Sequence, residues 1–157
     1  RGVAGDRTER VRLDGAGVVA GAAEGRLTGG SLATLLASLG TPWEIDLRGA
    51  IFLFEEVNEP PYRLDRMLEQ LVASGLLSRV AGIVVGQLVD CTHARHPEPT
   101  AREVVIEKLA ALGRPLVLDL PFGHGQPNFP WPLGARARLD GGRGRLEILE
   151  RGVVPRR

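Results

Sequence analysis

The segment Gly49–Leu68, GAIFLFEEVNEPPYRLDRML, holds the pattern that decides the fold. Its apolar run Ile51–Phe54 predicts a β-strand, and the proline pair and periodic leucines after it predict a helix. Because side chains alternate along a strand, we expect Glu55 on the same face as Ile51 and Glu56 on the opposite face. A strand that is apolar on both faces is usually buried on both. One carboxylate is therefore expected at the rim of a packed core, where an unpaired charge is costly.

The rest of the chain alternates between helix-like and strand-like segments. Helical periodicity with cap signals occurs over residues 31–40, 60–75 and 100–113. Strand signals occur in glycine-broken pieces over 11–30, in β-branched runs over 81–90 and 115–121, and in an alternating segment over 135–150. The last of these surrounds a glycine-rich turn, which is typical of a hairpin. The sequence thus predicts one α/β domain over residues 1–157, with a mixed sheet, about three helices and a C-terminal β-hairpin.

The composition excludes several classes of protein. Of the 157 residues, 43% are hydrophobic and 25% charged, and the net charge is +1, as in an ordinary globular domain. No basic stripe with interleaved aromatic residues occurs, so nucleic acid is not an expected partner. No apolar run approaches the roughly 20 residues of a membrane span, so no membrane is expected either.

The cysteine count and the N-terminus bear on where the chain comes from. The single Cys91 excludes an internal disulfide, which suits a reducing compartment. The stretch over residues 1–15, RGVAGDRTERVRLDG, lacks the apolar core of a signal peptide, and the chain does not begin with Met. We therefore expect a chain that is trimmed, processed or excised from something longer.

His124 is the first candidate for chemistry, because it stands between two glycines in a loop after the strand predicted at 115–121. Flanking glycines permit close backbone approach, which active-site loops often need. A histidine is the usual general base, and a carboxylate that holds its second ring nitrogen is the usual orienting group. Strand ends in an α/β sheet converge at one edge, so Glu55 and His124 could meet there. The alternative is a solvated His124 and a Glu55 paired with Arg63 or Arg66.

Two weaker patterns stay open. Cys91, His93 and His96 are of metal-ligating type, but they lack the paired spacing of structural zinc sites. As a nucleophile pair, Cys91 and His93 would point to the same side of an extended chain without touching. The segment Thr28–Ser31, TGGS, precedes a predicted helix and would either hold an anion or form a tight turn.

Four segments, taken together and in order, resemble the C-terminal domain of the LD-carboxypeptidases, which are serine peptidases of the murein tetrapeptide carboxypeptidase type. The segments are AEGRLTGGSLATLLASLGTPWEID, IFLFEEVNEPPYRLDRMLEQL, GIVVGQLVDC and LPFGHGQPNFPWPLGARARLD. They run from about Ala23 to Leu139, which is most of the chain. The resemblance implies a small swivelling domain with β/β/α layers.

The resemblance also implies roles for the two candidate residues. In the family a strand ends in a Glu-Asp pair, and a Pro-Tyr-Arg segment then opens a helix. Here the pair is Glu55-Glu56, followed by Pro61–Arg63. The triad glutamate of the family is the first of the pair, which implies Glu55. The triad histidine belongs to a Gly-His motif, which implies His124. Glu55 would orient His124, and Glu56 would face away with no catalytic part.

The nucleophile is the missing member of the implied triad. In the family the nucleophilic serine and the oxyanion-hole amides lie in an N-terminal domain that precedes this one. None of Ser31, Ser74 and Ser78 stands in a nucleophile elbow such as GxSxG. A base and an orienting group without a nucleophile do not make a peptidase, so we expect the chain to be inactive alone.

Three residues are candidates for substrate binding: Gly30, Ser31 and Trp131. The first two stand in the family's Gly-Gly-Asn-Leu motif, where Ser31 replaces the asparagine. Trp131, like Trp43, lies in a proline-bearing loop, where an aromatic ring lines a pocket or covers a core edge. If a partner domain has been removed, we expect Trp131 and Phe129 in an exposed apolar patch.

The complete enzyme that the resemblance implies removes the terminal D-alanine from a murein tetrapeptide, in the cytoplasm, during peptidoglycan recycling. The expected partners are the N-terminal nucleophile domain and the murein peptide, with a homodimer left open. No metal and no organic cofactor are implied. Two alternatives remain: a peptidase domain for self-immunity to peptide antibiotics, and a non-catalytic binding module that keeps the fold.

Overall fold

This computed structural model describes residues 11–150. They form eight strands and three α-helices. The strands are β1 (Arg12–Asp14), β2 (Ala16–Val19), β3 (Ala22–Ser31), β4 (Ile51–Val57), β5 (Gly82–Val89), β6 (Leu116–Leu118), β7 (Arg136–Asp140) and β8 (Arg145–Ile148). The helices are α1 (Leu32–Leu36), α2 (Pro61–Ala73) and α3 (Ala101–Ala110), with the short 3₁₀ helix η1 (Leu76–Arg79) after α2. The predicted mixed α/β class is confirmed. Most of the N-terminal stretch lies outside the described residues.

The strands form one mixed sheet in the order β1-β8-β7-β3-β4-β5-β6-β2. Strands β3 to β6 run parallel, whereas β7 and β8 form the predicted antiparallel hairpin. The long strand β3 joins the two parts, because its first half pairs with β7 and its second half with β4. The two ends of the order, β1 and β2, are separated in sequence by Gly15 alone, so the sheet must curve until its ends meet. A side chain at Gly15 would collide with the carbonyl oxygen of Leu118.

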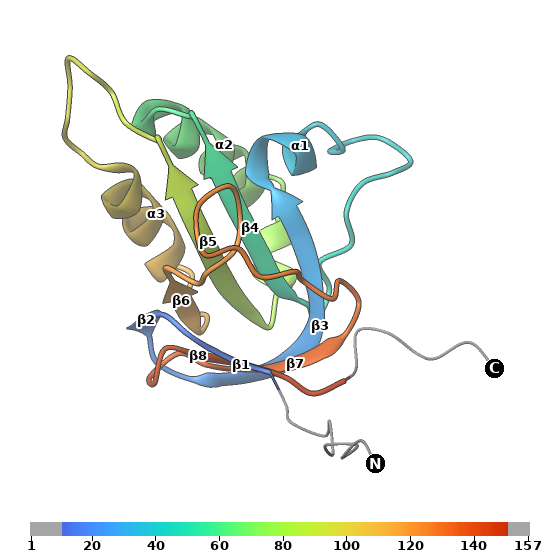
Figure 1. Ribbon diagram of the computed structural model, residues 1–157. Helices are drawn as coiled ribbons and strands as arrows, with labels where there is room; N and C mark the ends of the chain where they lie inside the picture. The colour runs from blue at the N-terminus through green and yellow to red at the C-terminus, as the bar shows by residue number, and fades with distance from the viewer. Residues whose placement is uncertain (1–10, 151–157) are drawn as a thin grey trace, which may run out of the picture.

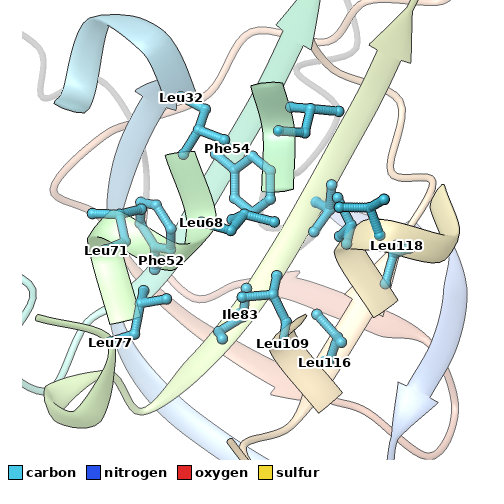
Figure 2. Close-up of a cluster of buried hydrophobic side chains, with 14 of the residues drawn as sticks. Leu32, Phe52, Phe54, Leu68, Leu71, Leu77, Ile83, Leu109, Leu116 and Leu118 are labelled. Carbon is cyan, nitrogen blue, oxygen red and sulfur yellow. The ribbon is translucent and has the colours of Figure 1, made fainter. Parts of the chain in front are cut away.

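The helices cover one face of the parallel strands, and the hairpin lies on the other side of the domain (Figure 1). Alternation along β4 sends Phe52 and Phe54 into the helix-side core, where their rings stack 5.5 Å apart (Figure 2). Ile51 and Leu53 instead enter the core that faces the hairpin. Each such fully buried apolar side chain stabilises the fold by about 1.5–3 kcal/mol relative to its exposed state.

Local signals explain most helix boundaries. Pro61 opens α2, where the missing N–H costs nothing, and Leu64, Leu68 and Leu71 are its buried face. Helix α3 begins with a complete capping box between Thr100 and Glu103. No helix within residues 11–150 is long and apolar enough to cross a membrane.

Helix α1 is shorter than the segment 31–40 that the sequence predicts. It ends at Leu36, and turns follow as far as Gly40, whose φ is +71°. The hydroxyl of Ser38 donates to the carbonyl of Leu35, and the hydroxyl of Thr41 donates to the carbonyl of Ser38. These hydroxyls bond to carbonyls that a longer helix would use, so the chain turns early.

Candidate active site

Glu55 and Glu56 stand near the carboxyl end of β4 and are both buried, with 7% and 3% of their surface exposed. Alternation along the strand sends them to opposite faces. Glu55 takes the hairpin side with Ile51, and Glu56 takes the helix side with Phe54. The predicted division of the two carboxylates between the faces is therefore confirmed.

Glu56 is bound to backbone groups. Its Oε2 accepts the N–H of Ala33 in the first turn of α1 at 2.7 Å, and its Oε1 accepts the N–H of Val57 at 3.0 Å. Ser31 is the N-cap of the same helix, and its hydroxyl accepts the N–H of Thr34. An exogenous anion is thus not needed at the Thr28–Ser31 segment, because a carboxylate of the protein already occupies the helix start.

Glu55 meets His124, which arrives on a loop after β6. This loop crosses in front of β5 and β4 in Figure 1 before it reaches β7. The Nδ1 atom of His124 lies 2.7 Å from Oε2 of Glu55, across 69 residues of sequence. The side chain of Glu55 is 9% exposed, whereas that of His124 is 54% exposed. The predicted contact between the two residues is confirmed.

This geometry suits a general base. The carboxylate of Glu55 favours a proton on Nδ1 of His124, which leaves the lone pair on Nε2. No hydrogen bond to Nε2 occurs within residues 11–150. The pair therefore consists of a buried acceptor and a half-exposed imidazole that is free to take a proton from a group outside this site.

Gly123 allows the loop to come this close to Glu55. Its φ is +121°, and a Cβ at this position would lie 2.9 Å from Oε2 of Glu55. A larger residue would be strained and would also push against the carboxylate. The glycines around His124 were thus a correct sequence signal for close backbone approach.

Gln87 of β5 also belongs to this site, and sequence analysis missed it. Its side-chain amide hydrogen-bonds to the backbone of Gly125 and of Pro127, on the far side of His124. The available signal was weak: Gln87 is a lone polar residue beside Gly86 in an otherwise apolar run.

No serine within residues 11–150 is placed as a nucleophile. The hydroxyls of Ser38, Ser74 and Ser78 each donate to a nearby carbonyl oxygen, and that of Ser31 caps α1. None of them is hydrogen-bonded to His124. The described part of the chain therefore pairs a carboxylate with an imidazole and places no serine hydroxyl against them.

The proposed substrate-binding residues lie at the end of β3 and in the His124 loop. Ser31 is directly beside Glu55 in the register of β3 and β4, and a Cβ at Gly30 would meet nothing within 4 Å. Trp131 lies in the His124 loop, where its ring packs edge-on against Phe122 at 4.0 Å. Their contact with substrate stays a prediction.

The exposed apolar residues differ in part from expectation. Phe129 and Leu133 of the His124 loop are 45% and 58% exposed. Trp131 is half-buried against the hairpin-side core and so contributes less to such a patch than predicted. Trp43, after α1, is 86% exposed and covers no core edge.

The other sequence alternatives find no support. Within residues 11–150, no three His, Cys, Asp or Glu side chains are grouped to hold a metal ion. Burial raises the pKa of the Cys91 thiol, which makes it a poor nucleophile at neutral pH. Arg63 pairs with Glu59 rather than with Glu55, and Arg66 stacks over the ring of Tyr62.

The described residues thus form a mixed α/β domain in which a buried carboxylate contacts a half-exposed histidine. The family model of the LD-carboxypeptidase C-terminal domain matches residues 24–139. The chain belongs to this family.

Relatives and solved structures agree with that assignment. The chain is 38% identical over 137 residues to the probable murein peptide carboxypeptidase of Bacillus subtilis. This alignment covers 87% of this chain and 43% of that protein. It is 38% identical over 121 residues to the murein tetrapeptide carboxypeptidase of Pseudomonas aeruginosa, and this alignment covers 76% of this chain and 39% of that protein. The crystal structure of muramoyltetrapeptide carboxypeptidase from Oxalobacter formigenes matches with a TM-score of 0.79 and 31% identity, over 90% of this chain and 51% of that one.

A more distant relative is named for a different role. The microcin C7 self-immunity protein of Escherichia coli is 27% identical over 133 residues, which covers 83% of this chain and 38% of that protein. In all these comparisons with curated proteins, the chain spans less than half the length of its relative.

Proposed function

We propose that this chain is the C-terminal half of a serine-type LD-carboxypeptidase that removes the terminal D-alanine from a murein tetrapeptide. The observation that carries the proposal is the 2.7 Å contact between Nδ1 of His124 and the buried carboxylate of Glu55. The names of the two murein peptide relatives supply the substrate class. The other triad member, a serine, comes from the preceding N-terminal domain of the same enzyme.

The roles of the two residues follow from their geometry. His124 takes the hydroxyl proton of the incoming serine on Nε2 as the serine attacks the scissile carbonyl, which creates an imidazolium. Glu55 stabilises that charge through Nδ1–H and holds the ring in the productive tautomer. The imidazolium then gives its proton to the leaving D-alanine amine. The shortened peptide then remains on the serine as an ester. A water that replaces D-alanine gives a proton to the same nitrogen and attacks this ester, and the proton returns to the serine oxygen as the peptide is released.

The partner domain meets this chain beside His124. The half-exposed imidazole must face the serine, and Phe129 and Leu133 provide exposed apolar surface on the same loop. Gly30 and Ser31, opposite Phe54 and Glu55 in the sheet, contact the substrate together with Trp131 of the His124 loop. The complete enzyme works in the cytoplasm, where recycled murein peptides are its substrate, and self-association into a homodimer is compatible with this arrangement.

A substrate comparison with the full-length protein tests the proposal. Murein tetrapeptide should release D-alanine, and a microcin-type peptide–nucleotide conjugate should be cleaved much more slowly. Preferential cleavage of the conjugate would instead support a self-immunity peptidase. Binding of the tetrapeptide without release of D-alanine would support a non-catalytic binding module.

A further inference from the structure

The loop that carries His124 has few attachments to the rest of the domain. Within residues 123–128, hydrogen bonds to other elements run to only two side chains of the described chain, Glu55 and Gln87. The remaining bond of this segment, from the N–H of Gly123 to the side chain of Asn128, is internal and long at 3.4 Å. Glycines at 123 and 125 add backbone freedom on either side of the histidine. The position of the imidazole therefore depends on how the loop is held.

Gln87 holds the loop on the C-terminal side of His124. Its Oε1 accepts the N–H of Gly125 at 2.8 Å, and its Nε2 donates to the carbonyl of Pro127 at 3.1 Å. Its own backbone N–H donates to the carbonyl of Phe122 at 2.9 Å. One residue of β5 thus binds the loop both before and after the histidine.

A β-bulge in β5 orients the side chain of Gln87 toward the His124 loop. In the pairing of β4 with β5, Phe54 lies opposite Val85, but Glu56 lies opposite Leu88, so β5 carries one extra residue. Val85 and Leu88 both pack into the helix-side core. The two residues between them, Gly86 and Gln87, are consequently the ones that contact the His124 loop.

We propose that Gln87 is a positioning residue that sets the imidazole of His124 against Glu55. The proposal rests on the proposed function for its catalytic consequence, but the positioning itself is a property of this chain. Gln87 touches neither the imidazole nor Glu55 in any hydrogen bond of the described residues. It acts by fixing the backbone on either side of the histidine.

The imidazole tautomer of His124 in the isolated chain is the direct readout. Nitrogen-15 shifts of the ring, measured at alkaline pH and assigned with His124→Ala, give the ratio of the Nδ1–H to the Nε2–H form. Contact with Glu55 favours the Nδ1–H form. Gln87→Met keeps the size of the side chain and removes both hydrogen bonds, so this ratio should fall roughly threefold or more. Gln70→Met, on the exposed side of α2, is the matched control and should leave it unchanged.

Gly125→Ala is a second variant, which tests the same proposal if Gln87→Met does not fold. A Cβ at Gly125 would lie 2.8 Å from Oε1 of Gln87, so Gly125→Ala should displace the amide and lower the same ratio. An unchanged ratio in either folded variant would overturn the proposal.

Kinetics of the full-length protein test the catalytic consequence separately. Gln87→Met should lower kcat by as much as about 100-fold and should change KM little. The reason is that a misplaced base affects the transition state more than substrate binding. An unaltered kcat would contradict the positioning role. If the wild-type enzyme released no D-alanine, the proposed function would fail, while the tautomer ratio would still decide the role of Gln87.

Discussion

At the scale of single residues, two adjacent glutamates have different surroundings. Glu55 accepts from an imidazole, and Glu56 accepts from two backbone N–H groups at the start of α1 and the end of β4. Both are buried, so each needs a partner to offset the cost of its burial. The two side chains have different partners because strand alternation sends them to opposite faces of the sheet. Substituting each glutamate separately therefore tests which face is catalytic.

Glu55→Gln in the full-length enzyme should lower kcat by several orders of magnitude. The amide is unable to stabilise the imidazolium and favours the wrong tautomer, an effect worth roughly 10⁴-fold in a serine protease triad. D-alanine release under saturating substrate is the measurement. A loss below tenfold would contradict the orienting role.

Glu56→Gln should act mainly on stability. The NH₂ group of the new amide must face one of two backbone donors, which leaves a buried polar group unsatisfied at a cost of about 1–3 kcal/mol. Urea unfolding of the chain should show this loss, and kcat of the full-length enzyme should change little. If Glu56→Gln removed activity and Glu55→Gln did not, the assignment of the catalytic face would be wrong.

Gly123→Ala should disturb the pair directly. The backbone there has a φ of +121°, and the added Cβ would lie 3.0 Å from Cβ of Glu55. Strain of about 1–3 kcal/mol and a loss of activity are expected. Gly142→Ala is the control, because the nearest atom to its Cβ is 3.5 Å away. Equal effects of the two variants, in unfolding and in turnover, would argue against a special role for Gly123.

At the scale of elements, the sequence predicted most of the fold but not its closure. The capping box of α3, the proline start of α2 and the apolar run of β4 are local signals, and the elements appear within a few residues of expectation. The single long strand β3 was predicted as glycine-broken pieces, because its pairing with both β4 and β7 is a long-range property. The bulge at Gln87 was invisible for the same reason.

The capping box gives a prediction at this scale. Thr100→Ala should lower the free energy of unfolding by about 0.5–2 kcal/mol, measured with urea at neutral pH. Hydrogen bonds from Thr100 hold the pKa of Glu103 below its usual range. Glu103 therefore stabilises the fold above its unfolded pKa, and this contribution is lost as the pH falls through its folded pKa. The difference in free energy of unfolding between the wild-type chain and Thr100→Ala should therefore shrink at acidic pH. A difference that increased at acidic pH would contradict the capping role.

At the scale of the whole molecule, residues 11–150 contain two members of the proposed triad, and none of their serines is hydrogen-bonded to His124. The contact of Glu55 with His124 could be predicted, because strand ends converge and the Gly-His and Glu-Glu motifs resemble those of the family. The position of the nucleophile could not be predicted, because none of the serines within residues 11–150 contacts this pair. The chain spans less than half the length of its curated relatives, which fits a division of the site between two domains.

Release of D-alanine from murein tetrapeptide tests this division most directly. The isolated chain should release none above background, because no serine of residues 11–150 is placed as a nucleophile. The full-length protein should be active, and His124→Ala should abolish that activity by removing the general base. Turnover by the isolated chain, or full activity of the His124→Ala enzyme, would contradict the account.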